Sequence, residues 1–409
     1  MSETNVEKEK CLLGSLDISI LEAEKRANPV LNIRDFFTAY LIESKVRDDA
    51  EENDDGFAPI SLLWRRYSEF EQLQQYLQAE YPYVIIPPLP EKKHTYTWRN
   101  PNSVIHDITD PDFVDRRRAG LENFLHRVAS HPLLSYDSLF KKFLTQENGW
   151  NETLKQEGYV QIVESKLKDL TVIPRFVSMD SQFKNLSNYS KQLENNLDSI
   201  LKSRSKVIEQ TYTVDMLHSH IGRLFSEWSV IEKYLGDGLQ KAGHFIDTIA
   251  SCTEATFQDE DVIVDQLKEY LFYTSSIDAV YKHHVRLQLQ IENLKTSVKS
   301  KVEEKERIQQ GKATVMARLF GALQTKEIRN EKVLQLDQRI SEDENKIVEL
   351  EESLKKFSEL ALEDFNRFQR QKDSDIQETL SSYVVQQIKV ARRGLNAWIN
   401  VKNCIETIP

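Results

Sequence analysis

Hydrophobic positions recur at seven-residue steps from residue 186 to residue 235. The stripe that they form is widened by Leu197, Leu217 and Leu224. No proline interrupts residues 175–408, although the chain contains 11 prolines. Proline breaks helices, so a long proline-free stretch with helical period predicts very long α-helices that pack against other helices. The seven-residue register consists of Leu186, Leu193, Ile200, Val207, Val214, Ile221, Trp228 and Leu235.

Two further helical stretches are expected, at residues 261–310 and 326–405, because apolar residues again recur at helical spacing among many charged ones. Turns are expected near residues 251–259 and 311–324, and the glycines at 236 and 238 predict a kink. Three helices of about 50 to 80 residues would span roughly 75 to 120 Å. Helices of that length cannot bury their apolar stripes within a compact monomer.

Composition narrows the class of protein. The formal net charge of -11 and the pI near 5.5 argue against nucleic-acid binding, which usually requires a basic domain or stripe. Membrane contact would likewise depend on local basic sites and a specific headgroup. The 3 cysteines are widely spaced, the first ten residues are polar, and no apolar run approaches the ~18 residues of a spanning helix. We therefore expect a reduced protein that is made and kept in the cytosol.

Three basic motifs lie in the first third of the chain. They are WRRYSEF at residues 64–70, PPLPEK at residues 87–92 and RRRAGLENF at residues 116–124. Fixed cations beside an aromatic ring suit an anionic sugar such as a phosphorylated inositol, because guanidinium groups bind phosphate oxygens and the ring supports the sugar face. A phosphoinositide headgroup is the leading candidate ligand.

In this order and spacing the motifs resemble the PX domain of the sorting nexins, over about residues 10–146. The resemblance implies an α+β domain, in which a three-stranded antiparallel sheet packs on helices. It implies that Arg66 contacts the 3-phosphate and that Tyr67 packs against the inositol ring. It also implies that Lys92 contacts the 1-phosphate and that Arg117 contacts the 4- and 5-hydroxyls. Without the resemblance, Arg66 and Tyr67 could simply belong to a half-exposed strand face.

Neighbouring residues limit how firmly the sequence assigns these roles. Arg116 and Arg118 flank Arg117, so a shift of one residue would change the assignment. Arg65 and Phe70 are expected to serve the structure of the domain. The proline-rich motif could also be read as a ligand for an SH3-type groove, but its position between an apolar run and a basic, aromatic loop favours an internal role.

The long helices, placed after such a domain, resemble those of the PX-BAR subfamily of sorting nexins. Residues 225–233, 236–243 and 265–273 carry a closer likeness to one branch of it. The resemblance implies an all-α BAR domain at residues 187–409, made of three long helices, that forms an antiparallel dimer with a second copy or a related PX-BAR sorting nexin. Its curved, partly basic face would rest on membrane. From periodicity alone, an ordinary coiled-coil spacer is an equal alternative.

Two segments could add membrane contacts. Tyr96 and Trp98 are large aromatics in a polar loop near the proposed site, so they are candidates for shallow insertion at the membrane interface, or for packing against their own domain. In the linker expected at residues 147–186, residues 158–173 show amphipathic spacing. The family implies a membrane wedge there, and a helix docked on its neighbours is the alternative.

Basic residues on the long helices are interspersed with acidic ones, so a solvated face is the ordinary interpretation. The family implies that some of them contact lipid phosphates. No phosphate-binding loop, zincin spacing or nucleophile elbow is present in the sequence, and the adjacent His283 and His284 lack the neighbours that a metal site needs. We expect neither catalysis nor a cofactor.

The function that these resemblances imply is that of a peripheral membrane protein on the cytosolic face of early endosomes. It would bind phosphatidylinositol 3-phosphate, dimerise, sense or induce tubular curvature, and support endosomal recycling and sorting as well as autophagy. The alternative is a coiled-coil scaffold that its PX domain tethers to endosomes, without remodelling of the membrane. Cargo and adaptor partners are not encoded in any motif that the sequence shows.

Overall fold

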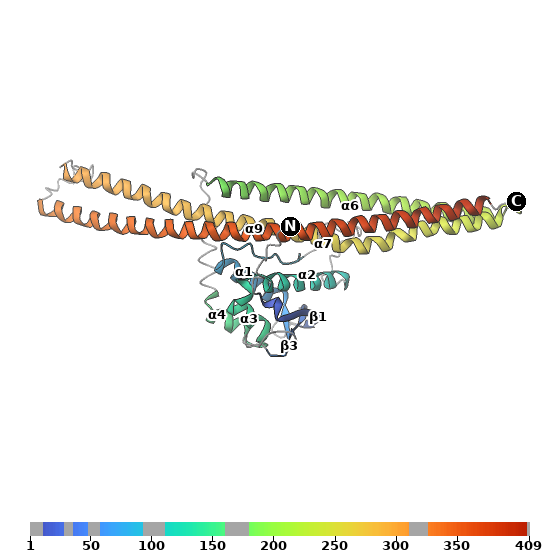
Figure 1. Ribbon diagram of the computed structural model, residues 1–409, viewed down its shortest axis with the longest axis horizontal. Coiled ribbons are helices and arrows are strands. Elements are labelled where there is room, and N and C mark those ends of the chain that lie inside the picture. The colour runs from blue at the N-terminus through green and yellow to red at the C-terminus, as the bar shows by residue number, and fades with distance from the viewer. Residues whose placement is uncertain are drawn as a thin grey trace, which may run out of the picture.

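The chain folds into a small N-terminal domain that lies beneath a bundle of long helices (Figure 1). The computed structural model describes residues 11–27, 36–47, 58–92, 111–159, 180–310 and 326–406. The long helices pass over the small domain and extend well beyond it on both sides, so the molecule is strongly elongated.

The N-terminal domain contains a three-stranded antiparallel sheet in the order β1-β2-β3, as the resemblance implied. One face of β1 is buried because hydrophobic residues alternate with polar ones at Leu16, Ile18 and Ile20. A register shift between Ile20 and Glu22 interrupts the pairing of β1 with β2. The strands are β1 at Leu16–Ala27, β2 at Phe36–Val46 and β3 at Ile60–Arg66.

Helices cover the buried face of the sheet and complete the core. Phe70 contacts the rings of Phe124 and Phe143 edge-on, which fits the structural role expected for Phe70. Arg65 is 1% exposed, and its guanidinium donates to the Phe143 carbonyl at 3.0 Å, so its expected structural role also has a physical basis. The helices are η1 at Leu12–Gly14, α1 at Tyr67–Glu80, α2 at Pro111–Ala129, η2 at Leu134–Tyr136, α3 at Ser138–Thr145 and α4 at Trp150–Gln156.

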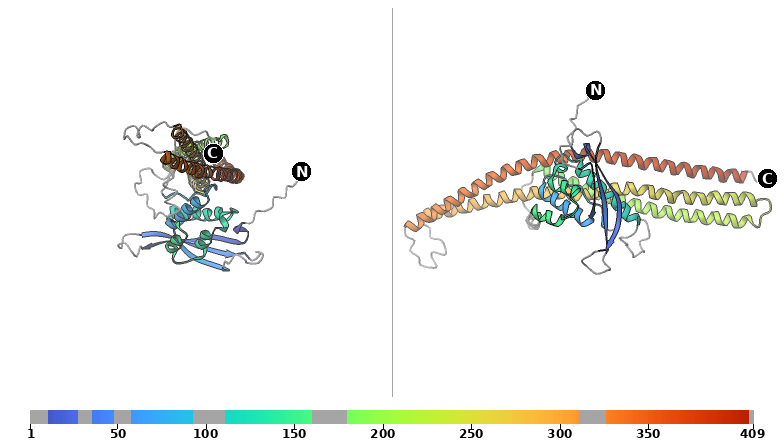
Figure 2. Two further views of the ribbon diagram at one scale, coloured as in Figure 1. Left: turned by 90° about the vertical axis from the view of Figure 1, so that its left-hand side faces the viewer. Right: turned by 90° about the horizontal axis from the view of Figure 1, so that it is seen from below.

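The bundle consists of α6 at Ser181–Ser229, α7 at Gly236–Gln309 and α9 at Lys326–Glu406, which have 49, 74 and 81 residues. Helix α7 packs against both α6 and α9. The arm, defined as the ends of α7 and α9 next to Gln309 and Lys326, extends beyond the start of α6. Figure 2 shows from below that the paired helices of the arm bow away from the line of the bundle.

The first turn between the long helices lies at residues 230–235 and not at residues 251–259, where the sequence predicted it. Helix α7 is continuous through residues 251–259, and the glycines at 236 and 238 belong to its first turn rather than to a kink. A Cβ on Gly236 would lie 2.8 Å from the Ser229 carbonyl oxygen, so glycine lets the two helix ends approach. The misplaced turn arises because Leu235 continues the seven-residue register past the end of α6.

Close packing at this end also depends on Gly222 and Gly243. A Cβ on either would lie 2.7 or 2.6 Å from the carbonyl oxygen of the other. The later helix ends agree better with the sequence, since α7 ends at Gln309 and α9 spans Lys326–Glu406. Helix α6 begins at Ser181, inside the segment expected as linker. The expected amphipathic helix lies outside the described residues beyond position 159, and the domain boundaries stay predictions.

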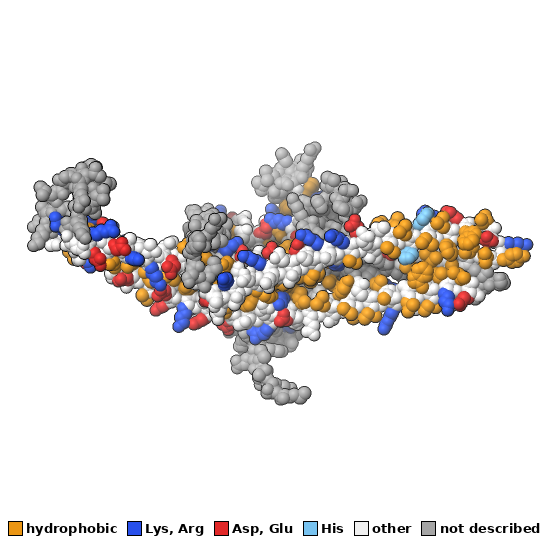
Figure 3. Space-filling model, turned by 90° about the horizontal axis from the view of Figure 1, so that it is seen from above, with side chains coloured by type: hydrophobic (Ala, Val, Ile, Leu, Met, Phe, Trp, Pro, Cys, Tyr) orange, Lys and Arg blue, Asp and Glu red, His pale blue; other side chains and the backbone are white. Residues whose placement is uncertain are grey.

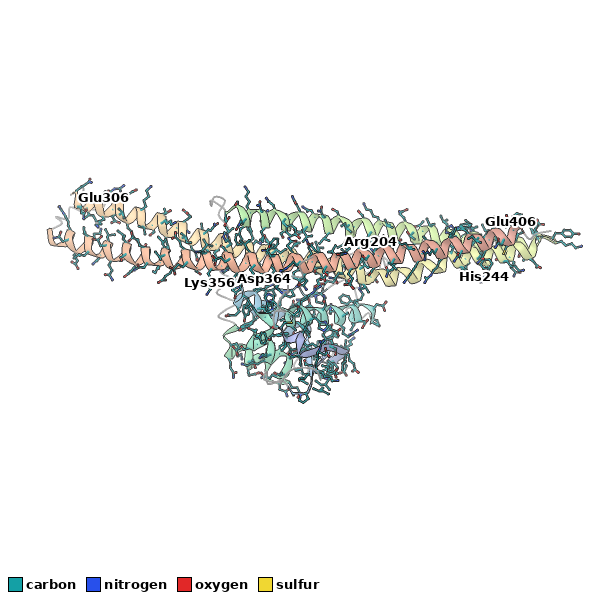
Figure 4. The ribbon with its side chains drawn as sticks, viewed as in Figure 1. Arg204, His244, Glu306, Lys356, Asp364 and Glu406 are labelled. Atoms are coloured by element: carbon teal, nitrogen blue, oxygen red, sulfur yellow. The ribbon has the colours of Figure 1, made fainter. Side chains whose placement is uncertain are left out.

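The proline segment, defined as residues 84–92, follows α1 in the chain and packs against the bundle. Ile85 packs in the hydrophobic core of the bundle, and its backbone N–H donates to Asp364 on α9 at 2.7 Å. His131 donates to the same carboxylate from Nε2 at 2.9 Å, because its Nδ1 accepts from the backbone N–H groups that follow it. Figure 4 marks Asp364 on the side of the bundle next to the domain. The internal role expected for the proline-rich motif therefore has a structural basis.

The Asp364 carboxylate accepts hydrogen bonds from several donors. Arg367 also donates to it, at 2.9 Å. Burial by itself raises the pKa of this carboxyl group, but the hydrogen bond from His131 and the charge of Arg367 lower the pKa overall. Asp364 thus stays ionised as the shared acceptor of the domain and the bundle.

Candidate phosphoinositide-binding site

Arg66 lies where β3 ends and α1 begins. Its backbone N–H donates to the Glu69 carboxylate at 2.8 Å, which satisfies the start of the helix. Its guanidinium carbon lies 3.7 Å from the centre of the Phe37 ring, a cation–π contact that orients the side chain. Among the described residues no carboxylate forms an ion pair with this guanidinium, so its charge is available to an anion.

Tyr67 is the first residue of α1 and lies at the centre of the site. Its hydroxyl donates to the Pro90 carbonyl at 2.6 Å and fixes the ring against the proline segment. Burial raises the pKa of Tyr67, which keeps the hydroxyl protonated as a donor. Two cations flank the ring, with Lys92 Nζ at 5.8 Å and the Arg117 guanidinium carbon at 5.2 Å from its centre.

Arg117 comes from α2 and is only 7% exposed. Its Nη2 donates to the Lys92 carbonyl at 2.7 Å, and the guanidinium also lies 4.2 Å from the centre of the Phe113 ring. Its Nε is buried without a hydrogen-bond partner. Burying an unsatisfied donor is costly, and the buried Tyr40 hydroxyl, which also lacks a hydrogen-bond partner, interacts with the same guanidinium.

The structure distinguishes the roles of the three consecutive arginines, which the sequence alone could not distinguish. Arg116 points to the bundle and pairs with Asp265, with 2.8 Å between Nε and Oδ2. Arg118 donates to Asp115 at 2.9 Å and to the Ile20 carbonyl. Of the three, Arg117 is the one whose guanidinium lies against Tyr67. Lys92 and Arg117 thus converge on the Tyr67 ring, whereas Arg66, the residue before Tyr67, lies against Phe37. The roles assigned to the four residues stay predictions.

Lys92 is the most exposed of the four, at 62% for its side chain. Its Nζ lies 2.6 Å from Glu71 Oε1. A surface ion pair of this kind contributes about 0 to 1 kcal/mol, so a phosphate can compete for the ammonium group. The site presents two cations at a fixed aromatic ring and a third, Arg66, on the residue before it. This arrangement can bind a ring-shaped polyanion, and among its described residues no nucleophile has a paired base.

The sequence did not single out three further residues that shape the site. Phe37 orients Arg66, and Glu71 holds Lys92 in the absence of ligand. Gly120 lies against the proline segment, where a Cβ would come within 2.7 Å of Pro90 Cβ. A glycine within the helical motif at residues 116–124 was the available signal for the last of these, since glycine weakens a helix unless close packing requires it. Tyr96 and Trp98 lie outside the described residues.

A cavity of about 300 Å³ lies behind the proline segment, between α2 and α7. Apolar side chains such as Leu89, Phe113 and Phe272 line much of it. Arg117 lies at the border between this cavity and the site around Tyr67. The proline segment therefore has the candidate site on one side and a region without close packing on the other.

Ion pairs engage several of the basic residues on the long helices that the family implied for lipid contact. Lys295 pairs with Glu351 at 2.7 Å, and Lys301 pairs with Asp343. These pairs link α7 to α9 along the arm and neutralise part of its positive charge. Lys299 is exposed and forms no ion pair with any residue in the described part of the chain.

The adjacent histidines that the sequence flagged are part of the aromatic packing of the bundle. His284 stacks on Phe183 with 3.6 Å between ring centres, and His283 stacks on Phe357 at 5.0 Å. Burial lowers the pKa of His284 to about 4. Within the ranges that the structure describes, no group of three or more His, Cys, Asp or Glu side chains could hold a metal ion, and no helix is long and apolar enough to cross a membrane.

Known proteins resemble both parts of the chain. The family model of the PX domain matches residues 59–147, which hold β3, α1, the proline segment and α2. The cryo-EM structure of the SNX-BAR Mvp1 tetramer superposes with a TM-score of 0.58 at 19% identity, covering 94% of this chain and 99% of that one. The fold thus combines a PX domain with the long helices of a BAR-type bundle.

The chain belongs to the PX-BAR sorting nexins. It is 40% identical to sorting nexin-4 of Bos taurus over 399 residues, which cover 96% of this chain and 87% of that protein. Sorting nexin-4 of Homo sapiens is likewise 40% identical over 400 residues. Sorting nexin-30 of Mus musculus is 27% identical over 258 residues. The branch that the three helical segments indicated is therefore that of sorting nexin-4, and membership implies peripheral association with membranes of the endosomal system.

Proposed function

We propose that this protein binds phosphatidylinositol 3-phosphate through the site around Tyr67 and is thereby recruited to the cytosolic face of early endosomes. The observation that carries the proposal is the Arg66 guanidinium, which Phe37 orients and which pairs with no carboxylate among the described residues. A polyanionic headgroup supplies the missing counter-charge. The exposed side of Tyr67, between Lys92 and Arg117, is suited to the face of the inositol ring.

Each cation has a distinct part in this binding. We assign Arg66 to the 3-phosphate, because its planar fork matches phosphate oxygens and can form a bidentate pair with them. Lys92 exchanges Glu71 for the 1-phosphate, and a flexible ammonium group suits this exposed position. Arg117 is suited to the 4- and 5-hydroxyls, since its Nη2 is already fixed by the Lys92 carbonyl and its Nε lacks an acceptor.

Dimerisation through the bundle is the second part of the proposal. The seven-residue stripe of α6 is covered at Leu186 but exposed by 59% at Val207 and 46% at Trp228. Figure 3 shows hydrophobic side chains gathered at the end of the bundle away from the arm. An apolar face of this extent indicates a protein interface, and a second copy or a related sorting nexin in antiparallel orientation would cover it. We call this the dimer face, and its members include Ile200, Val207, Val214, Leu217, Ile221, Leu224 and Trp228 of α6 and Val384, Ile388, Leu395 and Trp398 of α9.

A dimer with two headgroup sites and a bowed bundle would bind membrane tubules by multivalency. On this basis we propose that the protein senses or induces tubular curvature and supports endosomal recycling and sorting. The likeness to sorting nexin-4 is the support for a part in autophagy. Insertion of Tyr96 and Trp98 into the membrane stays part of the hypothesis.

Co-sedimentation with liposomes tests the headgroup site. The parent protein is compared with Arg66→Ala on phosphatidylcholine liposomes with and without phosphatidylinositol 3-phosphate. We expect lipid-dependent binding that Arg66→Ala abolishes. Arg47→Ala is the matched control, because Arg47 is an exposed arginine that pairs with Asp17 at the opposite end of the sheet. Binding that ignores the lipid, or that Arg66→Ala leaves intact, would refute the proposal.

A scaffold that is tethered to endosomes without remodelling them is the second candidate function. The ion pairs between α7 and α9 favour it, since they engage part of the positive charge of the described arm that lipid phosphates would otherwise contact. Small-angle scattering of the dimer and electron microscopy of liposomes separate the two. A crescent-shaped dimer that forms tubules supports remodelling, whereas a straight rod that binds vesicles without deforming them supports the scaffold. The matched relatives are sorting nexins rather than enzymes, and we propose no catalytic activity.

A further inference from the structure

The proline segment supplies the candidate site with much of its geometry. The Pro90 carbonyl accepts from the Tyr67 hydroxyl, and the Lys92 carbonyl accepts from Arg117 at 2.7 Å. Lys92 itself is the last residue of the segment. Any displacement of residues 90–92 would therefore move one cation of the site and release the hydrogen bonds that fix the aromatic ring and a second cation.

The other side of the same segment is bound to the bundle. The Ile85 N–H donates to Asp364 of α9, and the hydroxyl of Ser276 on α7 donates to the Ile86 carbonyl at 2.7 Å. Closer to the site, Lys268 Nζ of α7 lies 2.6 Å from Glu91 Oε1. Glu91 stands between the two residues whose carbonyls hold Tyr67 and Arg117.

This ion pair restrains residues 90–92 from the bundle side. The cavity of about 300 Å³ separates this part of the segment from close packing against α7. The Lys268 side chain is 3% exposed and that of Glu91 is 15% exposed, so water screens their attraction weakly. Removing one partner of such a buried pair weakens the compensation of the other charge, which favours a shift of that charge toward solvent.

We propose that Lys268, on the BAR helix α7, is a positioning residue of the phosphoinositide site in the PX domain. It acts through Glu91 and sets the position of Pro90 and Lys92, without contacting the headgroup. The headgroup site is thus completed by the helical bundle, although the two lie in different domains. This inference rests on the proposed function, because it concerns the affinity of the same site for phosphatidylinositol 3-phosphate.

Calorimetric titration of the full chain with a soluble, short-chain phosphatidylinositol 3-phosphate tests the inference, because this ligand removes contributions from membrane and avidity. We expect Lys268→Met to bind on the order of tenfold more weakly than the parent, which corresponds to about 1.4 kcal/mol. Lys268→Arg keeps the charge and has the adjacent cavity for its larger group, so we expect affinity within about twofold of the parent.

Glu91→Gln separates positioning from simple electrostatics. Removing a negative charge next to an anion site would strengthen binding if charge alone mattered, whereas loss of the positioning pair would weaken it. We expect binding on the order of tenfold weaker. The change is isosteric and its side chain is partly exposed, so it carries the test even where Lys268→Met does not yield folded protein.

Glu269→Gln is the matched control. Glu269 is the next residue on α7 and also forms an ion pair with the PX domain, through Arg127 at 2.9 Å, but no hydrogen bond or ion pair links it to the described proline segment. We expect this variant to bind within about twofold of the parent. Parental affinity of both Lys268→Met and Glu91→Gln would overturn the inference while leaving the proposed function intact. Equal weakening by all three variants would also overturn it, since general docking of the domains would then be the cause. A parent that does not bind the ligand would refute the proposed function itself.

Discussion

Replacing Gly120 by alanine tests the closeness of α2 and the proline segment, on which the candidate site depends. An ideal Cβ at this position would lie 2.7 Å from Pro90 Cβ and 3.1 Å from Pro90 Cγ. Carbon atoms in contact are ordinarily about 3.5 to 4.0 Å apart, so α2 and the segment would have to separate by about 1 Å. The ring of Pro90 is rigid, so its backbone would move with it, together with the carbonyl that holds Tyr67.

Two opposing effects set the stability of this variant. Alanine is favoured over glycine in a helix by roughly 0.5 to 1 kcal/mol, whereas overpacking costs about 1 to 3 kcal/mol. The net loss of stability is then between about 0 and 2.5 kcal/mol, which a domain of this size survives. The affinity is more sensitive, because a shift of about 1 Å weakens the hydrogen bonds from Tyr67 and Arg117 to the segment together. We expect about tenfold weaker binding.

Titration with the soluble headgroup ligand measures this effect, and thermal unfolding of the same samples reports stability. Gly394→Ala is the matched control, because a Cβ on this helical glycine of α9 would meet no atom within 4 Å. We expect it to bind like the parent and to unfold at the same or a slightly higher temperature. The reasoning is refuted if Gly120→Ala binds within twofold of the parent while its unfolding temperature shows that it is folded.

Three other outcomes are expected. Leu217→Glu combined with Ile221→Glu should convert the dimer into a monomer in sedimentation experiments, because both side chains belong to the dimer face, whereas Leu62→Glu on the exposed face of the sheet should leave the dimer intact. His284 has its pKa lowered by burial from 6.5 to about 4, so its contribution to stability is complete above pH 6.5 and is lost as the pH falls toward 4. The unfolding temperature of His284→Phe, measured across this pH range, should depend less on pH than that of the parent. The same dependence on pH in both proteins would contradict this. Asp364→Asn should cost about 1.5 to 3 kcal/mol and expose the domain junction to proteolysis, because it removes a charged acceptor with three donors, and an unchanged cleavage pattern would argue against that.

Much of the architecture could be predicted from the sequence because the hydrophobic residues of long helices recur with the helical period. The end of α7 at Gln309 and the start of α9 at Lys326 agree with the predicted stretches within a residue. The turn before Gly236 was misplaced because its apolar residues keep the seven-residue register, so hydrophobicity gives no sign that the chain reverses. The small polar residues at 251–259 suggested a break, yet α7 continues through them.

The candidate site could likewise be predicted from the sequence only in part. Arg66 and Tyr67 are adjacent in the sequence, and the motif around Arg117 was recognisable, so the cations and the ring could be proposed without coordinates. The choice of Arg117 over its neighbours required the direction in which each side chain leaves α2. The pair between Glu91 and Lys268 joins residues 177 positions apart, and no local pattern relates two charges at such a separation.

The proposed headgroup site and the dimer face lie in different parts of this molecule, although the bundle contributes to both. The contacts with the PX domain come from the middle of the bundle, at Asp265, Lys268 and Glu269 of α7 and at Asp364 of α9. The dimer face lies toward the end of the bundle opposite to the arm. Because several buried ion pairs fix the PX domain on the bundle, the direction of the headgroup site is set relative to the dimer face. Each copy in a dimer therefore presents its site in a direction that the bundle determines, and avidity for a membrane depends on the shape of the dimer as well as on the affinity of one site.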